Sequence, residues 1–215
     1  GHGGNNLDYL IRSNAARYAR NRRAILICPE VHNSFYTDMK YGRGYFTYLT
    51  EEMPRALRRF FGFEWKRELV SAVGLSMGAY GAFYLALSRP DLFQAAGAIS
   101  GPLDIHRLIA DIKNGERWRL PELMGILGED AVVPESGDLF KQVERMASFE
   151  QRPRLAACVG QEDFLYEHTI RFLDHCHEQA YPLEFWESPG EHNWEYWDDQ
   201  LEPMMDFCLK SLWFH

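Results

Sequence analysis

Short apolar runs recur along the chain, separated by longer segments in which apolar residues repeat every three or four positions. A run of four to eight apolar residues bounded by turn residues is typical of a buried strand. The valine-rich run Leu69–Leu75 is an example, as expected for a parallel strand covered on both faces. The predicted strands are Ala24–Cys28, Leu69–Leu75, Ala95–Ser100, Arg154–Val159 and Leu183–Glu187.

Helical patterns alternate with these runs. In Phe46–Phe61 the apolar residues recur at spacings of three and four, and Pro54 predicts a kink or a late helix start. The other predicted helices are Leu7–Arg23, Ala79–Leu87, Phe164–Ala180 and Trp197–Trp213. Strand and helix in alternation predict one α/β domain over residues 1–215, with a mostly parallel sheet and helices on both faces.

Residues Gly101–Phe149 are the least regular third of the chain. Two helical pieces, Ile105–Lys113 and Leu139–Phe149, lie among glycines and prolines. Because this segment lies between two predicted strands, it is a candidate lid or cap over a site. The alternative is a crossover connection with an extra helix, and the sequence leaves both open.

Length, composition and charge exclude several classes of protein. The 215 residues suffice for one domain with a substantial core, and 46% hydrophobic with 25% charged residues is ordinary for a soluble globular protein. A formal net charge of -8 disfavours a nucleic-acid partner, because phosphate binding needs a basic face. No apolar run reaches the length of a membrane span. We therefore expect a small-molecule partner, no nucleic acid and no membrane; a homo-oligomer stays open.

The four cysteines form no C-x-x-C pair and no metal-binding spacing. Cys28 and Cys158 lie in apolar runs, which predicts buried thiols. That usage suits a reducing compartment and favours a cytoplasmic location. His175 and His177 lack the further ligands that a zinc site requires, so neither a metal nor another cofactor is expected.

Residues Gly74-Leu75-Ser76-Met77-Gly78 match the pattern G-x-S-x-G. This pattern describes a nucleophile elbow, a sharp strand-to-helix turn that exposes a serine hydroxyl above a sheet. Alone it also fits an ordinary tight turn. Here it follows the predicted strand Leu69–Leu75 and opens the predicted helix Ala79–Leu87, so we interpret Ser76 as a nucleophile.

A serine nucleophile needs a base within hydrogen-bond reach and a third group that orients the base. Asp163 follows the predicted strand Arg154–Val159, and His192 follows Leu183–Glu187. The order serine, acid, histidine is that of α/β hydrolases, and ligands of open parallel sheets bind just past the strand ends. Ser76, Asp163 and His192 are therefore the predicted catalytic residues.

Other acids and histidines compete for these roles. Glu162 adjoins Asp163 but would point elsewhere, and we expect it to be solvated. His32 and His106 lie in loops that could approach the site. The remaining histidines are on a predicted helix or at the terminus: His168, His175, His177 and His215.

The predicted chemistry is cofactor-free acyl transfer to water, which needs two N–H groups to hold the oxyanion. The residue after the nucleophile, Met77, supplies one. The glycine-rich start, Gly1–Asn6, is expected to be a flexible loop of the kind that supplies the other. The aromatic residues Tyr36 and Tyr41 lie in a long loop and, with Trp194 after His192, are candidate substrate contacts; packing against the domain is the alternative.

At one position, Ala79, the chain departs from an enzyme family that often has glycine there. Several segments together match the motifs of that family. They are Gly1–Asn5, Phe35–Asp38 with Tyr41–Gly42, Leu49–Phe61, Gly74–Phe83, Gly160–Asp163 and His192–Trp197. On these residues the chain resembles the esterase D-type "putative esterase" family, and within it the small bacterial tributyrin and acetyl esterases. The resemblance is weakest over Gly101–Phe149.

The resemblance implies an α/β-hydrolase fold and hydrolysis of short-chain carboxylic esters. Relatives of this kind also cleave S-formylglutathione or remove acetyl and feruloyl groups from plant polysaccharides. A hydrolase-fold binding module with an inactive site is the non-enzymatic alternative. The resemblance also implies that the His2 N–H is the second oxyanion donor, and that further strands of the fold precede Gly1.

Overall fold

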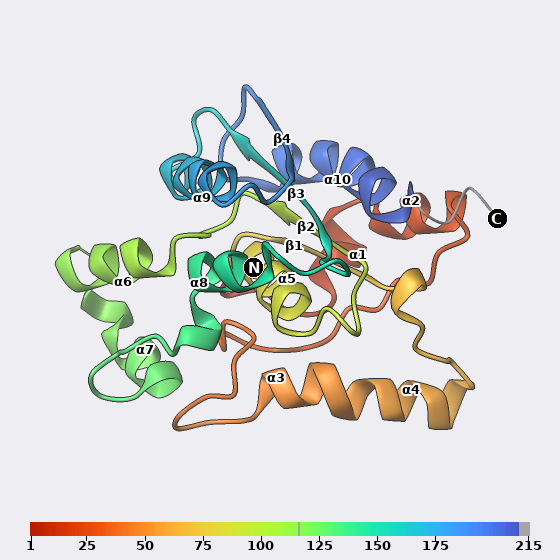
Figure 1. The fold of residues 1–215 in the computed structure, drawn as a ribbon, viewed down its shortest axis with the longest axis horizontal. Coiled ribbons are helices and arrows are strands. Elements are labelled where there is room, and N and C mark those ends of the chain that lie inside the picture. Colours follow the sequence, from red (N-terminus) through yellow and green to blue (C-terminus); the bar gives the residue numbers. More distant parts are fainter. Residues whose placement is uncertain (116, 211–215) are drawn as a thin grey trace.

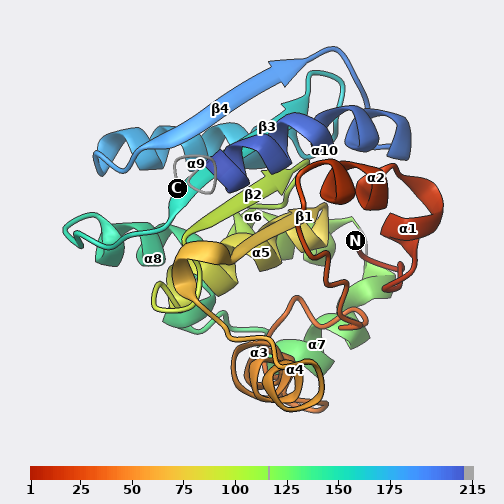
Figure 2. The same ribbon diagram turned by 90° about the vertical axis from the view of Figure 1, so that its right-hand side faces the viewer.

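Four parallel strands form the sheet of the computed structural model, which describes residues 1–115 and 117–210. The strands are β1 (Ser71–Leu75), β2 (Ala95–Ile99), β3 (Arg154–Gly160) and β4 (Leu183–Ser188), in the order β1-β2-β3-β4. Because all four run the same way, their carboxyl ends meet at one edge of the sheet (Figure 2). The expected α/β architecture is confirmed.

Helices cover both faces of the sheet (Figures 1 and 2). One face carries α5 (Met77–Ser88), α8 (Leu139–Met146) and α9 (Tyr166–Glu178), and the other carries α2 (Ala15–Asn21) and α10 (Trp194–Leu209). In β2, Ala96 and Ala98 face the first layer, whereas Ala95 and Ile99 face the second. Burial on both faces explains why this strand is apolar throughout.

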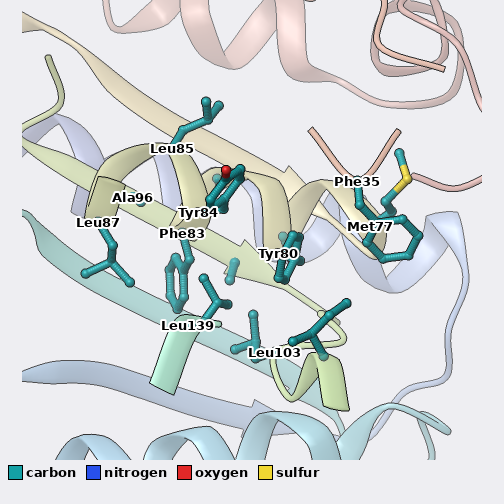
Figure 3. Packing of buried hydrophobic residues seen from close by; sticks show 14 of the residues in the cluster. Phe35, Met77, Tyr80, Phe83, Tyr84, Leu85, Leu87, Ala96, Leu103 and Leu139 are labelled. Atoms are coloured by element: carbon teal, nitrogen blue, oxygen red, sulfur yellow. The ribbon is translucent and has the colours of Figure 1, made fainter. Parts of the chain in front are cut away.

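The helix α5 is buried along nearly its whole length, from Met77 to Leu87. Figure 3 shows its aromatic side chains, Tyr80, Phe83 and Tyr84, among the leucines of neighbouring elements. The Tyr80 hydroxyl donates a hydrogen bond to the Gly137 carbonyl at 2.6 Å. A helix that is apolar on every side belongs in the interior of a domain, and this one fixes the position of the turn before it.

The apolar run Ala24–Cys28 does not form the strand that its composition predicts. Ile25 and Leu26 are 71% and 38% exposed. A cavity of about 500 Å³ is lined by residues of this run, Ile27 among them, and by residues of β1, Val73 among them. An apolar run becomes a strand only where a neighbouring edge takes its hydrogen bonds, and within the described residues this run pairs with no strand of the sheet.

Each of the two helices predicted in the N-terminal part of the chain is divided into shorter helical segments. Leu7–Arg23 divides into α1 (Asp8–Arg12) and α2 because Ser13 is extended, and the Asn14 N–H donates to Asp198 at 2.7 Å. Phe46–Phe61 comprises α3 (Tyr45–Thr47), a π-helical turn (Tyr48–Glu52) and α4 (Met53–Phe61). Pro54 lies in the first turn of α4, so the irregularity expected there is confirmed.

Residues 101–149 connect β2 to β3 through α6 (Ile105–Asn114), α7 (Leu120–Leu127) and α8. All three helices contribute buried residues to the same hydrophobic core, and α6 and α7 stand at one side of the molecule (Figure 1). This connection also contains short 3-10 turns at Arg117–Arg119 and Glu135–Gly137, and another 3-10 turn, Arg67–Leu69, precedes β1. Whether α6 and α7 move as a lid stays a prediction.

The last predicted helix begins earlier than expected, at Trp194, and residues 211–213 of that prediction lie outside the described residues. Within the described ranges, no helix combines the length and the apolar composition needed to cross a bilayer.

Asp104 joins the start of α6 to α9. Its buried carboxylate accepts hydrogen bonds from the Arg107 N–H at 3.0 Å and from Arg171 Nε at 2.8 Å. Burial by itself raises the pKa of this carboxyl, but the two donors outweigh burial and leave the pKa below its ordinary value. The group is therefore a carboxylate in the folded protein at neutral pH.

We expect Asp104→Asn to lower the free energy of unfolding at pH 7 by about 1–2 kcal/mol, since asparagine still caps the helix but has no charge for the partly exposed Arg171. A carboxyl whose folded pKa is depressed stabilises the fold above its unfolded pKa of about 4, and the contribution is lost as pH falls through the folded value. Urea unfolding at pH 7, 5 and 3 should show a difference that shrinks only below pH 4. An equal difference at pH 7 and pH 3 would contradict this.

Candidate active site

Ser76 occupies a strained turn between β1 and α5. Its backbone has φ 53° and ψ -125°, a conformation that non-glycine residues rarely adopt. Only glycine fits at position 74, because a Cβ there would lie 1.9 Å from the Gly78 carbonyl oxygen. This is the geometry that the G-x-S-x-G pattern predicts, with the Ser76 side chain past the carboxyl end of β1.

Three side chains from separate loops meet at this edge of the sheet. His192 Nε2 lies 3.0 Å from Ser76 Oγ, and His192 Nδ1 lies 3.0 and 2.9 Å from the two oxygens of Asp163. A carboxylate can only accept, so Nδ1 carries the proton and Nε2 accepts from the serine hydroxyl. The arrangement can remove the proton of Ser76 and stabilise the charge that this leaves on the imidazole.

The loops after β3 and β4 are packed backbone to backbone. A Cβ at Gly160 would lie 2.1 Å from the Gly190 carbonyl oxygen, and the Glu162 N–H donates to that same oxygen at 3.1 Å. The Glu162 carboxylate in turn accepts from the Gly190 N–H at 2.6 Å. Glu162 is exposed, as expected, and it also joins the loop of Asp163 to the loop of His192.

Asp163 is buried and charged. Burial alone raises the pKa of its carboxyl, but hydrogen bonds from His192 and from the Leu165 N–H, at 2.8 Å, outweigh burial and leave the pKa below its ordinary value. The charged form is the one that orients an imidazole and stabilises it when protonated.

The glycine-rich start of the chain lies beside Ser76. A Cβ built at Gly1 would lie 3.4 Å from Ser76 Cβ, and the Gly4 N–H donates to the Gly1 carbonyl at 3.2 Å, which closes a turn. Among the described residues, the N–H groups of His2 and Met77 have no hydrogen-bond acceptor. The expected flexible loop is thus a hydrogen-bonded turn, in which the His2 N–H directly follows the residue that lies beside Ser76.

Two aromatic side chains that the sequence analysis missed contact His192. The Phe164 ring lies 4.5 Å from the imidazole and is 72% exposed, and the Trp197 ring meets it edge-on at 4.8 Å. Phe164 directly follows Asp163, and Trp197 lies in the first turns of α10. Adjacency to the predicted acid was a signal that could have identified Phe164.

The three predicted substrate contacts lie in different surroundings. Tyr36 packs on α5, with its ring against Gly81 and its hydroxyl beside Gly78. Tyr41 is 62% exposed, and its N–H donates to the Gly125 carbonyl of α7. Trp194 packs edge-on against Tyr9 and Trp197. Contact of these three residues with substrate stays a prediction.

Three of the competing histidines have other partners in the described part of the chain, and His215 lies outside the described residues. His168 is buried and lies 3.3 Å from the Asp104 carbonyl, His106 contacts Asp138, and His32 is exposed. Cys158 is buried as expected, and Cys28 is half-buried.

A doubly covered parallel sheet with a strained serine elbow and a serine–histidine–aspartate arrangement at its carboxyl edge defines the α/β-hydrolase class of proteins. The chain belongs to the esterase family described as "Putative esterase", which matches residues 28–208. It is accordingly a carboxylic ester hydrolase.

Comparisons with known proteins agree with this membership. The chain is 24% identical over 220 residues to an acetyl esterase of Caldicellulosiruptor saccharolyticus, covering 98% of this chain and 81% of that protein. The fluorophosphonate-binding serine hydrolase F of Staphylococcus aureus has a similar structure, with a TM-score of 0.85 and 26% identity over 97% of this chain and 80% of that one. An S-formylglutathione hydrolase of the same organism has a TM-score of 0.78 and 26% identity, over 97% and 81% of the two chains.

We expect Gly160→Ala to lower kcat/KM for p-nitrophenyl acetate about 100-fold and to lower Tm. The added Cβ must separate the loops that carry Asp163 and His192, and a displacement of about 1 Å in a site costs that much. Gly125→Ala is the matched control, because nothing lies within 4 Å of a Cβ there and alanine favours a helix. Equal activity of the two variants would contradict the role given to this contact.

Proposed function

We propose that the chain is a serine esterase that hydrolyses short-chain, acetyl-like acyl esters through a covalent acyl-enzyme. The observation that carries this proposal is the hydrogen-bonded series Asp163–His192–Ser76, with donor–acceptor distances of 2.9–3.0 Å. In this assignment Ser76 is the nucleophile, His192 is the general base and acid, and Asp163 orients His192.

The proposed reaction has two halves. Ser76 Oγ attacks the ester carbonyl while His192 Nε2 takes the hydroxyl proton, and the tetrahedral intermediate collapses as His192 returns that proton to the leaving alcohol. Water then gives a proton to His192 and attacks the acyl-enzyme. The second intermediate then collapses as His192 returns its proton to Ser76 Oγ, which releases the acid and restores the Ser76 hydroxyl. The protons therefore balance over the cycle.

The N–H groups of Met77 and His2 are the proposed oxyanion donors. Met77 begins α5, whose N-terminal end carries partial positive charge, and both N–H groups lack an acceptor within the described chain. Preorganised donors of this kind stabilise charge as it develops, and loss of one donor costs about 3–4 kcal/mol in a well-studied protease.

Two kinds of observation support a small acyl ester as substrate. The curated relative is an acetyl esterase. Beside His192, the exposed ring of Phe164 supplies flat apolar surface suited to a small acyl or aryl group. The structural likeness to an S-formylglutathione hydrolase favours a thioester as the second candidate, since the same residues would perform that reaction.

The first test is hydrolysis of p-nitrophenyl acetate, butyrate and octanoate by the wild-type chain and by Ser76→Ala. We expect turnover that is fastest for acetate and butyrate and that Ser76→Ala abolishes. Ser148→Ala, which changes an exposed serine, should retain full activity. Activity that survives in Ser76→Ala would refute the mechanism.

A second comparison separates the two substrate classes. A kcat/KM for S-formylglutathione well above that for p-nitrophenyl acetate would replace the ester proposal by the thioester one. A folded wild-type chain that neither turns over these substrates nor reacts with a fluorophosphonate would indicate a binding module instead.

Phe164→Ala tests the exposed ring beside His192. If this ring contacts the substrate, its removal should raise KM for p-nitrophenyl butyrate about 3- to 10-fold and change kcat little, because apolar contact is lost equally in the ground and transition states. Phe61→Ala removes a similarly exposed ring on α4 and serves as the control. An unchanged KM would exclude Phe164 from the substrate site.

A further inference from the structure

The side chain of His2 is held by a carboxylate 120 residues away in the sequence. His2 Nε2 lies 2.8 and 2.9 Å from the two oxygens of Glu122, which is in the first turn of α7. Both side chains are 26% exposed, so solvent reaches the contact only in part. Glu122 thereby joins α7, in the segment 101–149, to the loop that lies beside Ser76.

A second contact holds the same loop at its next residue. Asn33 Nδ2 donates to Glu122 Oε2 at 2.9 Å, and Asn33 Oδ1 accepts from the Gly3 N–H at 2.8 Å. Glu122 therefore holds His2 directly and Gly3 through one intervening amide. Removing the carboxylate would release the His2 side chain and would leave Asn33, which holds Gly3, without its contact to α7.

The other hydrogen bonds of the loop do not involve His2: the Gly4 N–H closes the turn on the Gly1 carbonyl, and the Asn5 and Asn6 N–H groups donate to Asp8 and Glu30 at 2.7 and 3.1 Å. Residues 1, 3 and 4 are glycines, and Gly3 has a φ of 73°, which glycine adopts at little cost. A chain this rich in glycine has many accessible conformations, so an N–H that it carries is aimed only if side-chain contacts restrict them. The His2 N–H belongs to the residue that Glu122 contacts.

Charge strengthens this contact. Burial by itself raises the pKa of the Glu122 carboxyl, but the hydrogen bonds from His2 and Asn33 and the nearby Arg119, at 3.9 Å, outweigh burial and leave the pKa below its ordinary value. Glu122 is thus a carboxylate at neutral pH, and hydrogen bonds to a charged acceptor are stronger than those between neutral groups.

We propose that Glu122 is a positioning residue that aims the His2 N–H at the oxyanion by holding the side chains of His2 and Asn33. The inference rests on the proposed function, in which the His2 N–H stabilises the tetrahedral intermediates. It gives α7 a defined task, which is to hold one half of the oxyanion hole from outside the sheet. Glu122 itself does not touch the reacting atoms.

The test compares kcat and KM for p-nitrophenyl acetate in Glu122→Ala, Glu122→Gln and wild type. Because an oxyanion donor acts in the transition state, Glu122→Ala should lower kcat about 10- to 100-fold while KM stays within about 3-fold. Glu122→Gln keeps one acceptor oxygen for His2 and should recover part of the loss. Glu129→Ala, which removes an exposed carboxylate beyond the end of the same helix, should match wild type.

Non-additivity provides a second readout. His2→Ala leaves the backbone N–H in place but removes one of the two contacts, so we expect a smaller loss of kcat than in Glu122→Ala. Adding His2→Ala to Glu122→Ala should cause no further loss, because residues that act through one another are not additive. If the kcat of the double variant were lowered by the product of the two single losses, the proposal would be overturned.

Two results for Glu122→Ala would contradict the positioning role of Glu122. A kcat for Glu122→Ala within 2-fold of wild type, or a change in KM alone, would overturn the positioning role. If Glu122→Ala failed to fold by circular dichroism, Glu122→Gln and Asn33→Ala would decide by the same criteria. An inactive wild-type chain would refute the proposed function and this role with it, whereas an active wild type with an equally active Glu122→Ala would refute only the role.

Discussion

The hydrogen bond from His192 Nδ1 to Asp163 is the interaction on which the rest of the site depends. It fixes which imidazole nitrogen is free to accept from Ser76, and it spans two loops that follow different strands. Such a bond forms reliably only if the loops cannot move apart. The parallel sheet brings the loops to one edge, and the backbone contact of Gly160 with Gly190 holds them together there.

Close backbone contacts recur wherever the site demands accuracy. Gly74 lets β1 meet the first turn of α5, and the aromatic packing around α5 keeps that helix from shifting (Figure 3). The strained backbone of Ser76 persists because the buried helix and strand on either side determine it. The packing of the core thus fixes the backbone of Ser76 and, through it, the position of the Ser76 hydroxyl group.

The sequence was sufficient for what depends on local pattern. Parallel strands covered on both faces must be apolar, and a turn such as that around Ser76 must carry glycines, so the sheet and the order of Ser76, Asp163 and His192 could be predicted. Ala24–Cys28 was mispredicted because a strand also needs a neighbouring edge, which no pattern within the run reveals. The contact between His2 and Glu122 spans 120 residues and has no local signature.

The central claim is that Ser76 carries the acyl group during the reaction. The most direct measurement is to mix the chain with p-nitrophenyl acetate, quench in acid within the first turnover, and locate the modification by peptide mass spectrometry. The account predicts one acetyl group on the peptide that contains Ser76, formed together with a burst of p-nitrophenol and absent from Ser76→Ala. Steady turnover with no acetylated Ser76 peptide, or acetylation at another residue, would contradict it.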